Sequence, residues 1–227
     1  MSEPKQPTAA PPSRPAPTRD RLLDAAERLF GEHGFAATSL RTVTVAAEAN
    51  VAAVNYHFGS KEGLLRAVVE RAMAEVNGER LRLLEELGAA GDGRPGVAEL
   101  VRAFVMTGAR LVERSGERGA SVARFLGRVM AEPDPAIRRL FATEVGPVEG
   151  RYLDALRAAL PQLSAAEVAF RFRAMVGLLG LHQSSALGDL HPGDAAEGAA
   201  PGDDDAGRLV TFLTAAFHAP PTTGDER

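Results

Sequence analysis

TSLRTVTVAAEANVAAVNYHF, residues 38–58, is the stretch that decides the fold. Apolar residues recur in it where two short, crossed helices must face each other, at Val43, Ala47, Ala49 and Val54. Thr44 is small enough to lie where the helices cross, and Asn50 is a good N-cap for the second helix. The spacing predicts a helix-turn-helix. The competing interpretation is an ordinary helical hairpin in which Tyr56 and His57 are half buried.

A helix-turn-helix presents the N-terminal half of its second helix to the major groove of DNA. Here that half carries small side chains, which let its backbone approach the bases closely: Val51, Ala52 and Ala53. Their methyl groups can meet thymine methyls, and Asn50 or Asn55 can pair with an adenine edge. Tyr56, His57 and Lys61 follow, where they can bond phosphates that fix register rather than sequence. The stretch therefore predicts a protein that reads double-stranded DNA.

The chain on both sides of this stretch is also helical in pattern. Before it, an apolar stripe that stops near Gly34 contains Leu22, Ala26, Leu29 and Phe30. After it, Ser60 is expected to cap a long helix that reaches Leu87. Further helices are predicted over residues 97–115, 119–131, 134–160, 164–187 and 203–218. No strand-like alternation of useful length occurs, so the chain is predicted to be all-α.

Residues 18–69 resemble the DNA-binding domain of the TetR family of regulators. The runs that carry the resemblance are LDAAERLF, ATSLR and NYHFGSKEGLL. It implies a three-helix head in which Tyr56, His57 and Lys61 contact phosphates. It also implies that Thr38, Ser39 and Arg41 lie near the DNA backbone or the groove edge. Of these, Thr38 and Ser39 are expected to contact phosphates and Arg41 to read bases. The expected activity is transcriptional regulation, most often repression, by a homodimer that a small molecule releases from its operator.

One position departs from the family pattern. The turn between the two helices usually has glycine where this chain has Glu48. If the backbone there needs a positive φ, glutamate costs on the order of 1 kcal/mol.

Residues 97–217 resemble the family's regulatory domain more loosely, through ARFLGRVMAEPDPAIRRLF and EVAFRFRAMVGLLGLH. These stretches are similar to a branch of the family with members that respond to fatty-acid or acyl ligands.

Four parts of the chain follow from these patterns. Residues 1–17 contain six prolines and are expected to form a disordered tail. Residues 18–66 are the expected DNA-binding domain, and residues 67–218 the expected effector-binding and dimerisation domain. Residues 219–227 are expected to form a second disordered tail.

Large apolar side chains in the C-terminal part predict either an effector pocket or plain core filling. The residues predicted to line the pocket are Phe104, Phe125, Phe141, Tyr152 and Met175, with Arg128 as a polar anchor. Arg124 and His182 are further anchor candidates, although Arg124 and Arg128 fit a solvated face as well.

The last two helices are the predicted dimer interface. Glycine inside a helix costs about 1 kcal/mol relative to alanine, which close contact with another helix would offset. The predicted interface residues are Ala174, Gly177, Gly180, Leu213 and Phe217. Packing within one subunit is the alternative for the same residues.

Composition excludes several other classes. The chain has no cysteine, so it has neither disulfides nor thiol nucleophiles nor cysteine zinc sites. Its five histidines lack metal-site spacing, and no glycine-rich phosphate loop follows a strand, so no enzyme, cofactor or metal is expected. Without a signal-peptide pattern or a long apolar run, we expect a cytoplasmic protein that does not enter membranes. The net charge of −4 provides no general nucleic-acid coat, and an architectural DNA-binding protein without effector control stays the alternative.

Overall fold

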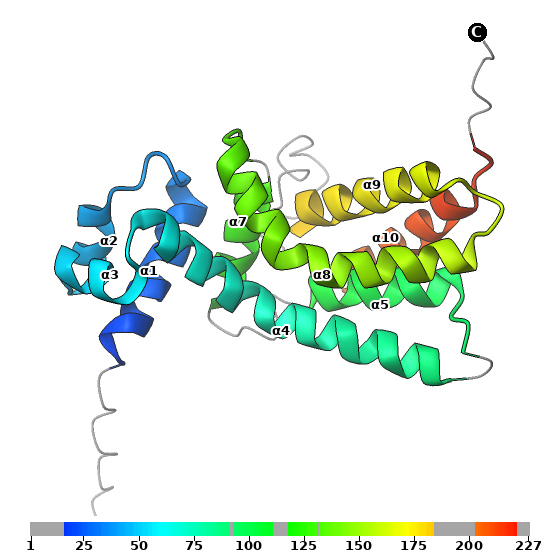
Figure 1. The fold of residues 1–227 in the computed structure, drawn as a ribbon, viewed down its shortest axis with the longest axis horizontal. Coiled ribbons are helices and arrows are strands. Elements are labelled where there is room, and N and C mark those ends of the chain that lie inside the picture. The colour runs from blue at the N-terminus through cyan, green and yellow to red at the C-terminus, as the bar shows by residue number, and fades with distance from the viewer. Residues whose placement is uncertain (1–15, 91–92, 111–117, 131, 184–202, 222–227) are drawn as a thin grey trace, which may run out of the picture.

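The computed structural model describes residues 16–90, 93–110, 118–130, 132–183 and 203–221. All regular structure in this part of the chain is helical, which confirms the all-α prediction (Figure 1). The helices are α1 (Thr18–His33), α2 (Leu40–Ala46), α3 (Val51–Phe58), α4 (Lys61–Ala89), α5 (Val97–Ala109), α7 (Gly119–Met130), α8 (Pro135–Ala159), α9 (Ala165–Gln183) and α10 (Asp203–His218).

Side-chain caps set the starts of several helices. The oxygens of Ser39, Asn50 and Ser60 accept from backbone N–H groups three residues later, at 2.9–3.0 Å. Asp134 caps α8 by accepting from the N–H of Ala136, two residues later, at 2.8 Å. The caps at Asn50 and Ser60 were predicted, because a cap depends on a few adjacent residues. Helix α5 ends at Ala109. Residues 111–115 of the expected 97–115 helix and residues 184–187 of the expected 164–187 helix lie outside the described residues.

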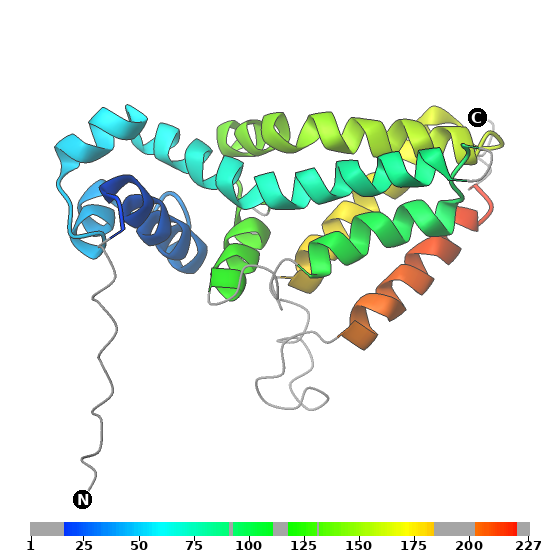
Figure 2. The ribbon, with the colours of Figure 1, turned by 90° about the horizontal axis from the view of Figure 1, so that it is seen from below.

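A small head and a larger body divide the molecule, as Figures 1 and 2 show. Helices α1, α2 and α3 form the head, and α5, α8, α9 and α10 form most of the body. Helix α4 belongs to both: its first half is buried in the head core and its second half in the body core. At 1.5 Å per residue its 29 residues span about 43 Å.

Helix α7 makes a second connection between head and body. It packs along α1 so closely that a side chain at Gly31 would lie 3.1 Å from the backbone nitrogen of Phe125. Phe125, Val122 and Val129 of α7 are buried in the same core as α1. The body therefore reaches the head both through the continuous helix α4 and through the packing of α7.

Candidate DNA-binding surface and regulatory cavity

The turn between α2 and α3 is closed by two backbone hydrogen bonds. The N–H of Glu48 donates to the carbonyl of Val45, and the N–H of Ala49 donates to that of Thr44, at 3.2 and 2.9 Å. This pairing is a Schellman motif, with Glu48 at the position that glycine usually occupies. Glu48 has a φ of 49°, the only positive φ of a non-glycine residue among those described. The left-handed backbone considered from the sequence is thus present.

Helix α3 exposes one face and buries the other. Val54 is fully buried against the rest of the head, whereas Val51, Ala52 and Asn55 are exposed. Tyr56, at the end of the helix, is 85% exposed, and its ring meets that of His57 edge-on. Half burial of Tyr56 and His57, which the hairpin interpretation required, does not occur. The exposed face consists of small and polar side chains, which suit close approach to DNA.

Arg41 and Val45 extend this exposed face onto α2, while Ala53 lies half-buried at its edge. Val45 is 71% exposed and was not among the predicted residues. Sequence spacing alone could not distinguish an exposed apolar side chain on this two-helix motif from an apolar side chain in the core.

Thr38 corrects the predicted set of phosphate contacts. Its side chain is 2% exposed, and its hydroxyl donates to the carbonyls of Leu29 and Gly34, at 3.1 and 2.8 Å. Thr38 therefore fastens the loop after α1 and does not face DNA.

Three other residues predicted to contact DNA also have structural roles. The oxygens of Ser39 and Asn50 cap α2 and α3, although both residues are exposed. The ammonium of Lys61 donates to the carbonyl of Phe35 at 2.6 Å and lies 4.2 Å from the centre of the Phe35 ring. Burial lowers the pKa of Lys61.

A cavity lies where five helices of the body meet. Its walls are Met73, Val76 and Arg80 of α4, Phe104 and Gly108 of α5, Leu126 and Met130 of α7, Phe141, Val145 and Glu149 of α8, and Val176, Leu179 and Gly180 of α9. Its volume is about 30 Å³. Sites for small molecules usually hold about 300–1,000 Å³, so a ligand would have to open this one.

Two ionisable groups of opposite sign line the cavity. Arg80 is 5% exposed, and its guanidinium lies 3.5 Å from the centre of the Phe104 ring. Burial lowers the pKa of Arg80 to about 10, which keeps the guanidinium charged at neutral pH. Burial raises the pKa of Glu149, although the nearby positive charge of Arg80 opposes that change. The hydroxyl of Tyr152 donates to the Arg80 carbonyl at 2.9 Å and so steadies this turn of α4.

The predicted pocket residues divide into two groups. Phe104 and Phe141 line the cavity. Phe125 does not: it is fully buried on the side of α7 that faces α1. Tyr152 and Met175 are fully buried in the body core and do not line it either.

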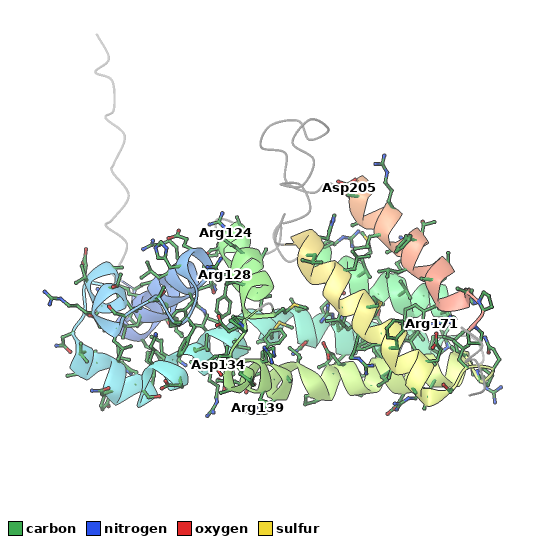
Figure 3. The ribbon with its side chains drawn as sticks, turned by 90° about the horizontal axis from the view of Figure 1, so that it is seen from above. Arg124, Arg128, Asp134, Arg139, Arg171 and Asp205 are labelled. Carbon is green, nitrogen blue, oxygen red and sulfur yellow. The ribbon has the colours of Figure 1, made fainter. Side chains whose placement is uncertain are left out.

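The predicted anchor Arg128 is also wrong. Its guanidinium lies beside Gly34, in the loop after α1, so it points to the head (Figure 3). Sequence reasoning missed Arg80 and Glu149 instead. The signal for Arg80 was present, because it follows Met73 and Val76 on the apolar face of α4 and precedes Leu84.

The predicted dimer residues also fall on two different faces. Ala174 and Gly177 lie on the exposed side of α9, and a side chain at Gly177 would meet nothing within 4 Å. Gly180 is wrong, because it faces the cavity, where a side chain would lie 2.8 Å from Met130. Leu213 and Phe217 are wrong as well, since both are buried where α10 packs on α5.

The outer side of α9 and α10 carries other large apolar side chains. Phe170 and Phe212 are 61% and 62% exposed, and Leu181 is 46% exposed. Phe170, Ala174, Gly177 and Leu181 recur at helical spacing along α9, so they form one stripe. Exposed apolar stripes are typical of surfaces through which proteins associate.

A cluster of ion pairs joins α1, α4 and the start of α7. Glu27 of α1 is 1% exposed, and its carboxylate accepts from Arg71 at 3.0 Å and from Arg118 at 2.6 Å. Asp24, one turn earlier, pairs with Arg71 at 2.8 Å. Since Arg118 directly precedes α7, the cluster fixes that helix to the head.

Two family profiles match the chain. Residues 22–68 match the profile described as bacterial regulatory proteins, tetR family, and residues 102–216 match that described as tetracyclin repressor-like, C-terminal domain. The chain belongs to the TetR family. It is accordingly a DNA-binding transcriptional regulator with a helix-turn-helix, and not an enzyme. No helix in the described part is long and apolar enough to cross a membrane.

Curated proteins named as transcriptional regulators resemble the chain over different lengths. The repressor NicS of Pseudomonas putida is 34% identical over 88 residues, which are 39% of this chain and 40% of NicS. The regulator BetI of Rhizobium meliloti is 27% identical over 166 residues, 73% of this chain and 77% of BetI. The chain spans less than half the length of several other curated relatives that it matches.

Solved TetR structures share the fold. The fatty acid degradation regulator FadR of Bacillus halodurans superposes with a TM-score of 0.63 at 14% identity. The superposition covers 92% of this chain and 99% of FadR.

Proposed function

We propose that this TetR regulator is a homodimeric repressor that binds one specific operator and leaves it when a small apolar effector enters the cavity. The observation that carries the DNA-binding half is the exposed face of α3. Val51, Ala52 and Asn55 are open to solvent directly after a tight turn. Methyl groups and an amide are the side-chain chemistry that distinguishes A·T pairs in the major groove.

Dimerisation is proposed to use the apolar stripe on α9 together with Phe212 of α10. Two heads related by a two-fold axis read two half-sites about 34–36 Å apart when they enter successive major grooves on one face of DNA. The operator would then be a palindrome or nearly one.

Release is proposed to act through α7 and α4. Leu126 and Met130 of α7 line the cavity, whereas Phe125 of the same helix packs on α1. A ligand that enlarges the cavity must displace one of its walls, and α7 and α4 are walls that also touch the head. Helix α4, whose residues Met73 and Val76 line the cavity, begins directly after the recognition helix.

The names of relatives agree with these roles. NicS is named a repressor, and FadR of Bacillus halodurans is named for fatty acid degradation. These names, with the apolar cavity walls, make a molecule with an acyl chain the first candidate effector.

The test is a selection of bound fragments from the genome of the source organism, followed by titration of an enriched fragment and of a scrambled copy. We expect the enriched fragment to bind about 10³-fold or more tighter than the scrambled one at physiological salt. Equal affinities would instead identify an architectural protein. Replacing Ala53 or Asn55 should change which sequence is preferred, and a uniform loss on all sequences would contradict base reading by these residues.

A further inference from the structure

The charges in the cavity specify the chemistry of the effector's polar group. Arg80 has few partners for a buried guanidinium. Among the described residues, it donates one hydrogen bond, to the Phe104 carbonyl at 3.4 Å, and its buried Nε–H meets no acceptor there. A buried donor without an acceptor destabilises the folded protein. An acceptor supplied by a ligand would remove that penalty.

Glu149 faces the same cavity from α8. Its carboxylate takes part in no hydrogen bond or ion pair with Arg80 or with the other described residues, although the two charges are close enough to interact through space. The cavity thus offers a donor from one wall and an acceptor from another. A group inserted between Arg80 and Glu149 can satisfy both.

The position of Arg80 is fixed before any ligand arrives. Its guanidinium stacks on Phe104, whose ring packs edge-on against Tyr152 and Phe172, with ring centres 5.2 and 5.3 Å apart. A donor held in place in this way loses little freedom on binding, which favours affinity and selectivity.

We propose that the effector is an uncharged molecule with an apolar body and one head group that accepts from Arg80 and donates to Glu149, of which a primary carboxamide is the simplest example. The proposal rests on the proposed role of the cavity as the effector site. A carboxylate head would satisfy Arg80 but would lie against the carboxylate of Glu149. An ammonium group would satisfy Glu149 but would lie against the guanidinium of Arg80. Like charges placed together are strongly unfavourable.

The rest of the cavity suits a hydrocarbon chain. Val76, Leu126, Val145, Val176 and Leu179 supply apolar walls. Met73 and Met130 are also in the lining, and methionine side chains rearrange readily to admit a ligand. Met130 in particular fills the space beside Gly180.

The test uses three probes with one eight-carbon chain and different heads: octanamide, octanoate and octylamine. Each is titrated into the full-length protein at pH 7 by calorimetry. For the wild type, we expect octanamide to bind about tenfold or more tighter than either charged probe. Glu149→Gln should reverse the preference towards octanoate, and Arg80→Met should shift it towards octylamine.

Two matched variants control for general effects of charge. Asp154→Asn makes the same chemical change at an exposed site of α8, and Arg82→Met does so at an exposed site of α4. Both should keep the wild-type order of the three probes. Circular dichroism of every variant shows whether it is folded.

Several outcomes overturn the proposal: a wild type that prefers octanoate, an order that Glu149→Gln leaves unchanged, or no binding of any probe. The proposed function fails separately, if no genomic fragment is bound selectively. If the protein binds its operator selectively but binds none of the three probes, only the assignment of the effector's polar group is disproved.

Discussion

Glu48→Gly should stabilise the protein, although it removes a side chain. A left-handed conformation costs a non-glycine residue about 1–2 kcal/mol, and Glu48 adopts one with a φ of 49°. Glycine also lowers the free energy of unfolding by about 0.4–1 kcal/mol, because it makes the unfolded chain more flexible. The exposed Glu48 side chain buries little, and the carbonyl that accepts from Arg21 is kept. The net gain is about 0.5–1 kcal/mol, or ~1–4 °C in Tm for a chain of this length.

Thermal unfolding followed by circular dichroism measures this change, with Glu48→Ala and Glu48→Asn as controls. Alanine keeps the steric cost of the left-handed backbone and should bring no gain, whereas asparagine tolerates that backbone and should fall between alanine and glycine. A lower Tm for the glycine variant, or equal gains for glycine and alanine, would refute the strain argument.

Three further changes test other parts of the molecule. Lys61→Met should lower the log–log salt slope of DNA binding by about 0.9 if the ammonium also neutralises a phosphate, and an unchanged slope would limit Lys61 to its bond with Phe35. Gly177→Leu should give folded monomers in sedimentation velocity, because the monomer has room for the side chain; a variant that stays dimeric would place the interface elsewhere. Glu27→Gln leaves two arginines without their buried carboxylate and should destabilise the protein by about 3 kcal/mol in thermal unfolding, and a loss below ~1 kcal/mol would mean that solvent replaces the pair.

The head was predictable because its determinants are local. Asn50 and Ser60 cap the helices that follow them. Glu48 and Ala49 close the turn, because their N–H groups donate to carbonyls three and five positions earlier. Each of these arrangements depends on residues adjacent in the chain. The residue spacing that predicted these caps and this turn is also the spacing that allows their hydrogen bonds to form.

The body was predictable as helices but not as surfaces. Leu213 and Phe217 have the spacing of an interface and are buried under their own subunit, whereas Phe212 beside them is exposed. Apolar spacing shows that a helix has an apolar face, but not whether that face meets its own core, a cavity or a second copy. Phe125 failed as a pocket residue for the same reason, because it lies on the opposite side of α7 from the cavity.

Gly180→Leu tests, without a known effector, whether the state of the cavity controls DNA binding by the head. A side chain at Gly180 would begin 2.8 Å from Met130 of α7 and would act as a permanent ligand. The measurement is the Kd for an enriched genomic fragment by fluorescence anisotropy, with Gly180→Ala as a smaller step and Gly78→Ala, at an exposed site of α4 with open space around it, as control. We expect a Kd raised about tenfold or more for a folded, dimeric Gly180→Leu protein, within the usual range of allosteric coupling, and no change for Gly78→Ala. A folded, dimeric Gly180→Leu protein with the wild-type Kd would contradict control of the head by the cavity.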